Sequence, residues 1–265
     1  MLREMGLRLW LPPVAAGAGV TEASPTAPAV QPARTPAPEN RGHPGRPDVP
    51  VARASADPMT DRVRSAADPA GTTASMDWPA LKSAVESCRA CGLCDGRQQT
   101  VFGAGNLRAQ CLVVGEAPGE QEDASGEPFV GDSGQLLDRM LRALGWSRDD
   151  ADPAHQVFIT NTVKCRPPRN RNPTADELAA CQPFLQRQVE LLQPRVILAM
   201  GAFAVRSLLG SDEPIGKLRG RLHRWRGVPL VVTYHPAYLL RQPADKAKAW
   251  DDLCLAASCL DGKNA

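Results

Sequence analysis

The sequence predicts an α/β fold, a three-layer α/β/α sandwich with a central four-stranded parallel sheet. Two observations support this prediction. Four short apolar segments alternate along the chain with longer segments in which apolar residues recur at helical spacing. Within the short segments the apolar residues are continuous, which is typical of strands that helices cover on both faces.

Each expected element has its own signal in the sequence. The expected strands are residues 111–115, 157–161, 195–201 and 228–235. The expected helices are residues 77–85, 133–144, 174–192, a helix that ends at 209, and 244–260. Asp77 can cap the first helix, with Pro79 in its first turn. Thr174 and Glu177 form a capping box at the start of the third helix.

Residues 1–75 have the composition of a disordered tail, and we expect the folded domain to span residues 76–265. The tail holds 12 of the 25 prolines, many alanines and one aromatic residue, Trp10. Such a segment cannot bury enough apolar area to offset its chain entropy. A linker, a tail that binds an unidentified protein and a mis-assigned start codon would all have this composition.

The overall composition narrows the class of protein. The formal net charge is only +2, so any nucleic-acid site must come from local basic clusters. No apolar run reaches the ~20 residues that cross a bilayer, so we expect no membrane association. Eight cysteines are too sparse in 265 residues for a disulfide-stapled scaffold. We therefore expect a cytoplasmic protein that uses its C-x-x-C pair for metal or redox chemistry.

Three of the expected strands lead into polar residues. The first ends at Gly115 and is followed by Glu116 and Ala117, the second ends at Asn161, and the fourth ends at His235. Because ligands bind beyond the carboxyl ends of parallel strands, we expect one site at this edge. Each residue alone could equally serve in a loop, a turn or the core, but three together favour a site.

Four short segments carry a resemblance to a known family. They are GEAPGEQED (115–123), PFVG (128–131), TNTVKCRPP (160–168) and HPAYLLR (235–241). With these segments in this order and spacing, the chain resembles the family 4 uracil-DNA glycosylases over roughly residues 77–260. The resemblance implies a uracil-DNA glycosylase-like fold. It also implies a hydrolase that releases uracil from DNA, the first step of base excision repair. Because no lysine that could form a Schiff base is evident at the strand ends, we expect a monofunctional enzyme that leaves an abasic site without strand cleavage.

The resemblance implies roles for the residues at the strand ends. Glu116 matches the acidic residue that positions or activates the attacking water, and His235 the histidine that stabilises the leaving uracil. Phe129 matches the ring that stacks on the flipped base, and Asn161 the amide that recognises its pyrimidine edge. The implied substrate-binding residues are Gly115, Ala117, Phe129 and Asn161.

The same resemblance implies how DNA is held. The segment after His235 is expected to enter the minor groove, with Leu239 filling the space that the flipped base leaves, although Leu239 could equally be a core residue. Arg241 and Arg166 are the expected DNA-contacting cations. The two basic clusters at residues 164–171 and 219–226 could contact phosphates or only keep the surface soluble.

Four cysteines are spaced as ligands of one metal centre. Cys88 and Cys91 form a C-x-x-C pair, while Cys165 and Cys181 lie far downstream. Four thiolates suit either zinc or an iron–sulfur cluster, and spacing does not separate the two. The resemblance implies that these four hold a [4Fe–4S] cluster with a structural role. Cys94 lies three residues after Cys91 and could replace one of the four.

Two rival functions belong to other classes. A module that grips uracil-containing DNA without turnover is disfavoured, because residues 166–177 lack the histidine through which some relatives trap DNA. An electron-transfer protein built on the cluster would leave the polar strand ends unexplained. The expected partner is therefore uracil-containing DNA. We expect a monomer that associates with the nucleoid during repair.

Overall fold

The structure is a computed structural model that describes residues 73–149, 152 and 155–261. The predicted disordered tail, residues 1–75, therefore lies outside the described residues except for its last three positions. All described residues belong to one compact unit.

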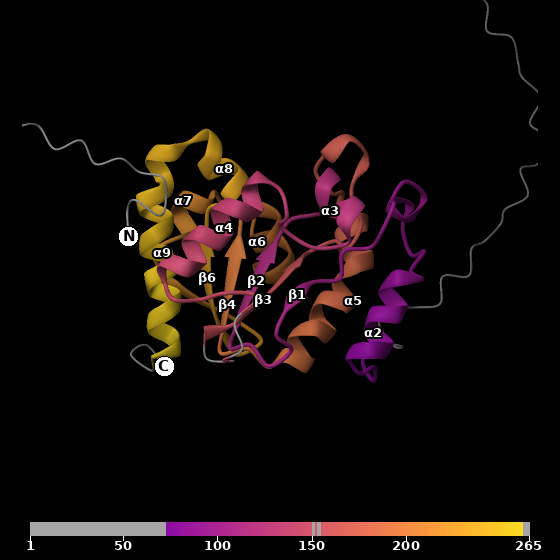
Figure 1. Ribbon diagram of the computed structural model, residues 1–265, viewed down its shortest axis with the longest axis horizontal. Helices are drawn as coiled ribbons and strands as arrows, with labels where there is room; N and C mark the ends of the chain where they lie inside the picture. The colour runs from indigo at the N-terminus through magenta and orange to yellow at the C-terminus, as the bar shows by residue number, and fades with distance from the viewer. Residues whose placement is uncertain (1–72, 150–151, 153–154, 262–265) are drawn as a thin grey trace, which may run out of the picture. The chain divides into compact units, whose positions relative to one another are not determined.

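The sheet at the centre of the domain has the strand order β1-β3-β2-β4-β6-β5 (Figure 1). The strands are β1 (Ala104–Gly105), β2 (Cys111–Gly115), β3 (Val157–Asn161), β4 (Val196–Met200), β5 (Leu222–Trp225) and β6 (Val228–Thr233). The four central strands are parallel, as predicted. The predicted strand count was too low, because a short antiparallel strand adds to each edge of the sheet.

The antiparallel edge strand β5 forms a hairpin with β6. The two residues between the strands, Arg226 and Gly227, both have positive φ, 47° and 85°. Such a turn matches the twist of a two-stranded ribbon. The hairpin segment lacks a continuous apolar run, since three of the four β5 residues are not buried. The apolar pattern that revealed the central strands therefore could not reveal this one.

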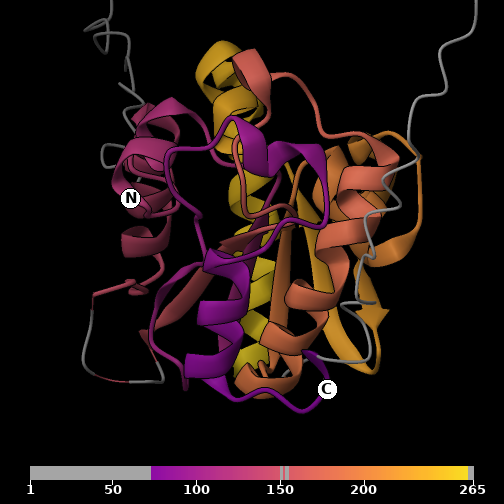
Figure 2. The ribbon, with the colours of Figure 1, turned by 90° about the vertical axis from the view of Figure 1, so that its right-hand side faces the viewer.

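Helices cover both faces of the sheet, which confirms the predicted three layers (Figures 1 and 2). One face packs against α2 (Trp78–Glu86), α5 (Ala175–Leu192), α6 (Ala202–Leu209) and the short α7 (Ile215–Leu218). The other face packs against α4 (Asp132–Ala143), α8 (Pro236–Arg241) and α9 (Lys246–Leu260). Neighbouring residues of β2 serve opposite faces, with Leu112 in the first core and Val113 in the second.

The predicted caps are present. Asp77 accepts a hydrogen bond from the backbone N–H of Ala80 at 3.0 Å, and Thr174 and Glu177 form the expected capping box. The structure also adds the short helix α3 (Glu120–Ser125) and makes residues 236–241 the helix α8 rather than an irregular loop. No described helix has the length and apolar character that crossing a membrane requires.

The parallel strands end level with one another at a single edge of the sheet. Gly115 pairs in register with Asn161, and Met200 pairs with Thr233. This edge is the upper one in Figure 1, where the segments after the strands gather. The sheet therefore presents the polar residues that follow β2, β3 and β6 on one side of the domain.

Candidate active site

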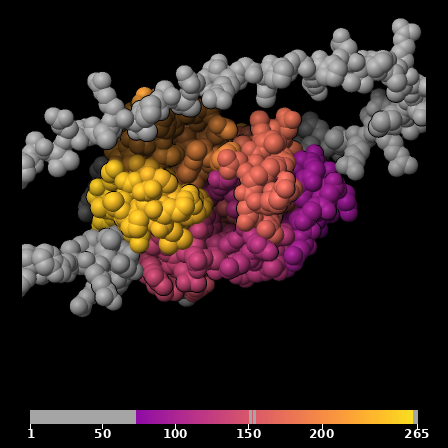
Figure 3. Space-filling view, turned by 90° about the horizontal axis from the view of Figure 1, so that it is seen from above, coloured from indigo at the N-terminus to yellow at the C-terminus, as the bar shows by residue number. Residues whose placement is uncertain are grey.

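A cleft of about 790 Å³ opens at the carboxyl edge of the sheet. Figure 3 looks down on this edge. The predicted site residues that line the cleft are Glu116, Ala117, Phe129, Asn161, His235 and Arg241. Three parallel strands thus deliver the key side chains to one cleft, although these residues are far apart in the sequence. Gly115, Arg166 and Leu239 do not line it.

Phe129 sits in the wall of the cleft in a strained backbone conformation. Its φ is 56°, and a non-glycine residue in this region costs about 1–3 kcal/mol unless its surroundings impose it. Glu122 of α3 accepts hydrogen bonds from the backbone N–H groups of Val130 and Gly131, at 2.9 and 3.1 Å. Arg148 donates to the carbonyl oxygen of Phe129 at 3.2 Å. Polar side chains therefore hold the backbone on both sides of the ring.

Two glycines make room for this arrangement. A Cβ at Gly134 would collide with the carbonyl oxygen of Phe129. A Cβ at Gly115 would lie 2.5 Å from both the Phe129 ring and Oδ1 of Asn161. Gly115 thus does not face the cleft itself, but its missing side chain lets the ring and the amide approach each other.

Asn161 ends β3 with its amide at the cleft. The residue is 2% exposed, and its Oδ1 is a buried oxygen for which no hydrogen-bond partner exists among the described residues. Buried polar atoms in native proteins are nearly always paired, so an unpaired one that lines a cleft indicates a place for a ligand donor.

His235 is the N-cap of α8 and its ring is neutral at physiological pH. The ring Nδ1 accepts a hydrogen bond from the backbone N–H of Ala237 at 3.2 Å. Burial, together with the nearby charge of Arg241, lowers the pKa of His235 to about 4. Because Nδ1 is an acceptor, the single proton of the neutral ring lies on Nε2. The ring also stacks on Phe129, with ring centroids 5.4 Å apart.

Glu116 provides the carboxylate of the cleft. Burial raises the pKa of its carboxyl group above the ordinary value. Its carbonyl oxygen accepts a hydrogen bond from the Thr162 hydroxyl at 2.6 Å, which ties the segment after β2 to the segment after β3. A carboxylate next to a neutral histidine and an unpaired amide is a set of groups suited to general acid–base chemistry.

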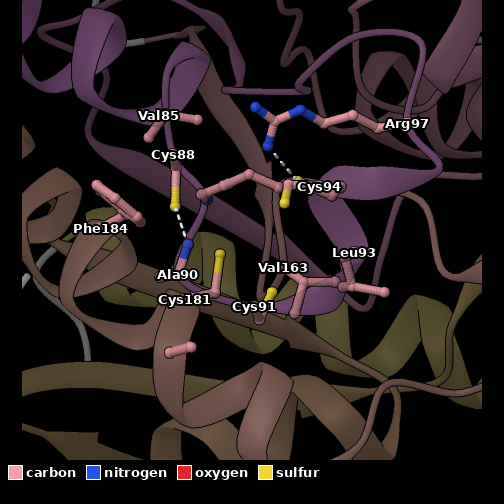
Figure 4. A pocket seen from close by; sticks show the side chains of 13 residues that line it. Val85, Cys88, Ala90, Cys91, Leu93, Cys94, Arg97, Val163, Cys181 and Phe184 are labelled. Carbon is pink, nitrogen blue, oxygen red and sulfur yellow. Dashed lines mark hydrogen bonds between the residues drawn. The ribbon is translucent and has the colours of Figure 1, made fainter. Parts of the chain in front are cut away.

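The four predicted metal ligands line a second, mostly apolar space, which we call the cysteine cavity. Its cysteines are Cys88, Cys91, Cys94, Cys165 and Cys181. Figure 4 shows the labelled cysteine side chains turned toward a common space between the segment after α2 and the helix α5. All eight cysteines of the chain are free thiols. Among the described residues, no three His, Cys, Asp or Glu side chains are arranged to hold a metal ion.

Cationic and polar groups surround the sulfur atoms. Arg97 donates to Sγ of Cys165 at 3.1 Å and to the carbonyl oxygen of Glu86 at 2.8 Å. The backbone N–H of Ala90 donates to Sγ of Cys88 at 3.5 Å. Burial raises the pKa of Cys181 to about 12, so this thiol stays protonated unless a metal centre takes it up. Four thiols from three segments line this cavity, and a guanidinium donates to one of their sulfur atoms, so the donor set suits an iron–sulfur cluster in its chemistry, although the side chains are not arranged as a metal-binding group.

Comparison with known proteins identifies the family. The model of the uracil DNA glycosylase superfamily matches residues 102–254. The chain belongs to this superfamily. A type-4 uracil-DNA glycosylase of Pyrobaculum aerophilum is 40% identical over 188 residues, which cover 68% of this chain and 93% of the relative. The type-4 enzyme of Thermotoga maritima is 45% identical over 166 residues, 62% of this chain and 83% of the relative.

The predicted DNA wedge of this superfamily member needs a correction. Leu239 is 0% exposed and belongs to the core on the α4 side of the sheet, because residues 236–241 form the helix α8 and that position faces inward. The next residue, Leu240, is 43% exposed. An apolar wedge must be free to leave the protein surface, so Leu240 rather than Leu239 meets this requirement.

Several residues of the two basic clusters make contacts within the protein, although most of the arginines remain exposed. Lys164 is buried, and Arg171 forms an ion pair with Glu177. Arg219 pairs with the buried Asp252. Arg166 is half-buried and pairs with Glu120 at 3.3 Å, next to the cleft but not in its lining. Arg241 lies outside both basic clusters, and its exposed side chain lines the cleft.

Sequence reasoning missed the residues that support Phe129. Glu122 lies inside the quoted segment 115–123, yet its role depends on backbone groups of residues 119, 130 and 131. Arg148 and Gly134 lie outside every quoted segment. Gly134 lies in the first turn of a predicted helix, where a glycine lowers helix stability. Its position there could have indicated that a close backbone contact requires a glycine.

Proposed function

We propose that this member of the superfamily is a monofunctional uracil-DNA glycosylase. It hydrolyses the N-glycosidic bond of deoxyuridine in DNA, releases uracil and leaves an abasic site, the first step of base excision repair. The observation that supports this most strongly is the meeting of Glu116, Phe129, Asn161 and His235 in one cleft. The relatives named above are type-4 uracil-DNA glycosylases, and the chain covers most of their length.

In this proposal Asn161 distinguishes uracil from cytosine. Its unpaired Oδ1 accepts a hydrogen bond from N3–H of uracil, and its amide nitrogen donates to O4. Cytosine has an unprotonated N3 and an amino group at position 4, so it presents the reversed pattern. Phe129 stacks on the base, an interaction worth about 1–3 kcal/mol. The flipped base therefore supplies the hydrogen-bond donor that Oδ1 of Asn161 lacks in the protein.

His235 stabilises the leaving group. Negative charge accumulates on uracil as the N-glycosidic bond breaks, and the Nε2–H of the neutral ring donates a hydrogen bond to O2. The depressed pKa of His235 means that the ring acts as a fixed hydrogen-bond donor rather than as a source of a full positive charge. Uracil departs as an anion held by this donor and by the amide of Asn161.

Glu116 acts on the water. Bond cleavage leaves an oxocarbenium-like sugar, and the Glu116 carboxylate orients a water molecule and accepts its proton as the water adds to the sugar carbon. The cleft lining among the described residues contains no lysine that could form a Schiff base. This supports simple base release without strand cleavage.

The finer features of the enzyme follow from the same arrangement. We place Leu240 as the wedge in the minor groove, with Arg241 and Arg166 beside the DNA backbone. Cys88, Cys91, Cys165 and Cys181 would hold a [4Fe–4S] cluster, which would tie the segment after α2 to the loop after β3 and to α5. We further propose a monomeric, cytoplasmic enzyme whose catalytic domain begins near residue 76 and whose tail contacts a separate protein.

The test is release of uracil from an oligonucleotide that contains one deoxyuridine. The full-length protein should convert it to an abasic site that breaks only after alkali treatment, and His235→Ala should slow this at least about 10²-fold. A protein that binds this oligonucleotide but never releases uracil would be a binding module and would refute the proposal. Direct strand breakage without alkali would refute the monofunctional mechanism.

A further inference from the structure

Lys164 is a lysine buried within the domain. It is 1% exposed and is among the largest fully buried side chains of the described residues. Its ammonium donates to three uncharged oxygens, Thr160 Oγ1 at 2.6 Å, the backbone oxygen of Asn161 at 2.8 Å and Gln188 Oε1 at 2.7 Å. No carboxylate forms an ion pair with it within the part of the chain that the structure describes.

Such a residue is costly for stability. Removing an ammonium from water carries a large free-energy penalty, and neutral hydrogen-bond acceptors offset it only in part. An apolar side chain of similar volume would fill the same space without this penalty. The position of Lys164 also excludes contact with DNA, because the side chain does not reach solvent. Its presence therefore calls for a role inside the protein.

The acceptors of Lys164 show what it holds in place. Two of the three, Thr160 and Asn161, are the last two residues of β3. The third, Gln188 of α5, donates to the carbonyl oxygen of Phe102, which also accepts from the Thr160 hydroxyl. Lys164 thus clamps the carboxyl end of β3 to the helix that covers it. Oδ1 of the clamped residue Asn161 has no hydrogen-bond partner among the described residues, so the position of the backbone contributes directly to where the amide points.

The other side of Lys164 faces the cysteine cavity. Lys164 lines this cavity and directly precedes Cys165 in the chain. Its backbone N–H contacts the sulfur of Cys181, and its carbonyl oxygen accepts a hydrogen bond from Val101 at 2.8 Å. One residue therefore contacts both the Cys181 thiol and the strand end that carries the amide of the cleft.

We propose that Lys164 is a positioning residue for base recognition, which links the loop of Cys165 to the backbone of Asn161 and so fixes the orientation of the Asn161 amide. This inference rests on the proposed function, in which that amide recognises uracil. The lysine itself touches no substrate. Its contribution is to hold the base-recognising group in place, an effect for which small displacements are costly.

The test is a double-mutant cycle between Lys164→Met and Asn161→Ala in the full-length protein. The measurements are the inhibition constant of free uracil, the dissociation constant for DNA that contains an abasic site, and the iron and sulfide content. Lys82→Met is the matched control, because it makes the same replacement at an exposed site on α2. Thr160→Val serves as a second, milder variant that removes one acceptor of the ammonium.

We expect Lys164→Met to raise the inhibition constant of free uracil about tenfold or more, while abasic-site DNA binds within about twofold. In the Asn161→Ala background, Lys164→Met should have no further effect on uracil inhibition, and Lys82→Met should have none in either background. If Lys164→Met loses iron or does not fold, the double-mutant cycle between Thr160→Val and Asn161→Ala tests the inference in its place. If Lys164→Met raised the inhibition constant of uracil by the same factor with and without the Asn161 side chain, the inference would be overturned. A normal response of Asn161→Ala to uracil would instead overturn the proposed base recognition.

Discussion

The cleft and the cysteine cavity lie at the two ends of the segment 161–165, yet they are built in opposite ways. The cleft is wide, about 790 Å³, and it holds an unpaired amide oxygen at Asn161 and a strained backbone at Phe129. The cavity is far smaller, about 10 Å³, its exposed lining is almost wholly apolar, and Arg97 donates a hydrogen bond to one of its sulfur atoms. The buried amide oxygen without a partner in the cleft indicates a place for a substrate donor, whereas the free thiols of the cavity suit a permanent metal centre.

This comparison makes a general prediction about variants. Changes in the cleft should lower the rate of uracil release and leave the stability of the domain intact. Changes in the cavity should lower stability and iron content first, and activity only as a consequence. The following predictions test this division, from the largest expected effect to the smallest.

The largest effect is expected from Cys181→Ala in the cysteine cavity. In the proposed cluster Cys181 is the ligand from α5, so its loss would free that helix from the loop after β3. We expect loss of iron and sulfide and a Tm lower by about 10 °C or more. Cys254→Ala, at an exposed cysteine outside the cavity, is the control and should change neither. Full iron content in Cys181→Ala would remove Cys181 from the ligand set.

In the cleft, Glu116→Gln should have the largest effect on rate. The amide keeps the shape of the side chain but cannot accept a proton from water, so uracil release should slow by about 10²–10⁴-fold. Single-turnover kinetics measure this step without product release. Iron content and Tm should match the unchanged protein. A variant that loses iron in parallel with its activity would contradict the division between the two regions.

The pH dependence of the rate separates Glu116 from His235. An exposed glutamate has a pKa of about 4.3. Burial raises the pKa of Glu116, so as the pH falls the Glu116 carboxylate should gain its proton at a higher pH than an exposed glutamate would. The rate should then fall about tenfold per pH unit. His235, with a pKa of about 4, stays neutral through this range and adds no transition near pH 6.5. The fall in rate at low pH should be absent in Glu116→Gln. If it persisted in that variant, another group would be responsible for it.

Gly115→Ala should have a smaller effect on the rate. The added Cβ would lie 2.5 Å from the Phe129 ring and from the amide of Asn161, and one of them must shift. A displacement of this size should lower kcat/KM by about 10²-fold. Gly96→Ala is the matched control, because a Cβ there meets nothing within 4 Å. Normal activity of Gly115→Ala would show that the ring and the amide need not be close.

Much of this arrangement could be predicted from the sequence because it depends on local pattern. The four central strands are continuously buried, so their apolar runs stand out, and the parallel topology alone brings Glu116, Asn161 and His235 to one edge. The strand β1 has two residues and could not be seen in this way.

The support of the site could not be predicted, since it depends on contacts between distant segments. The backbone of Phe129 needs Arg148 and the missing side chain of Gly134, and no periodicity reports such contacts. Lys164 illustrates the same limit. In the sequence it belongs to a basic cluster, but the fold buries it under the end of β3.

The smallest effect on uracil release is expected from Leu240, and its neighbour Leu239 should behave in the opposite way. Leu239→Ala removes a buried side chain and should destabilise the domain by about 2–5 kcal/mol. Leu240→Ala changes an exposed side chain and should leave stability within about 0.5 kcal/mol. The wedge is needed only where a base must leave a stacked duplex. Leu240→Ala should therefore slow uracil release from double-stranded DNA by about tenfold while single-stranded DNA is processed at the normal rate. Equal losses on the two substrates would mean that Leu240 supports the cleft rather than the opened duplex.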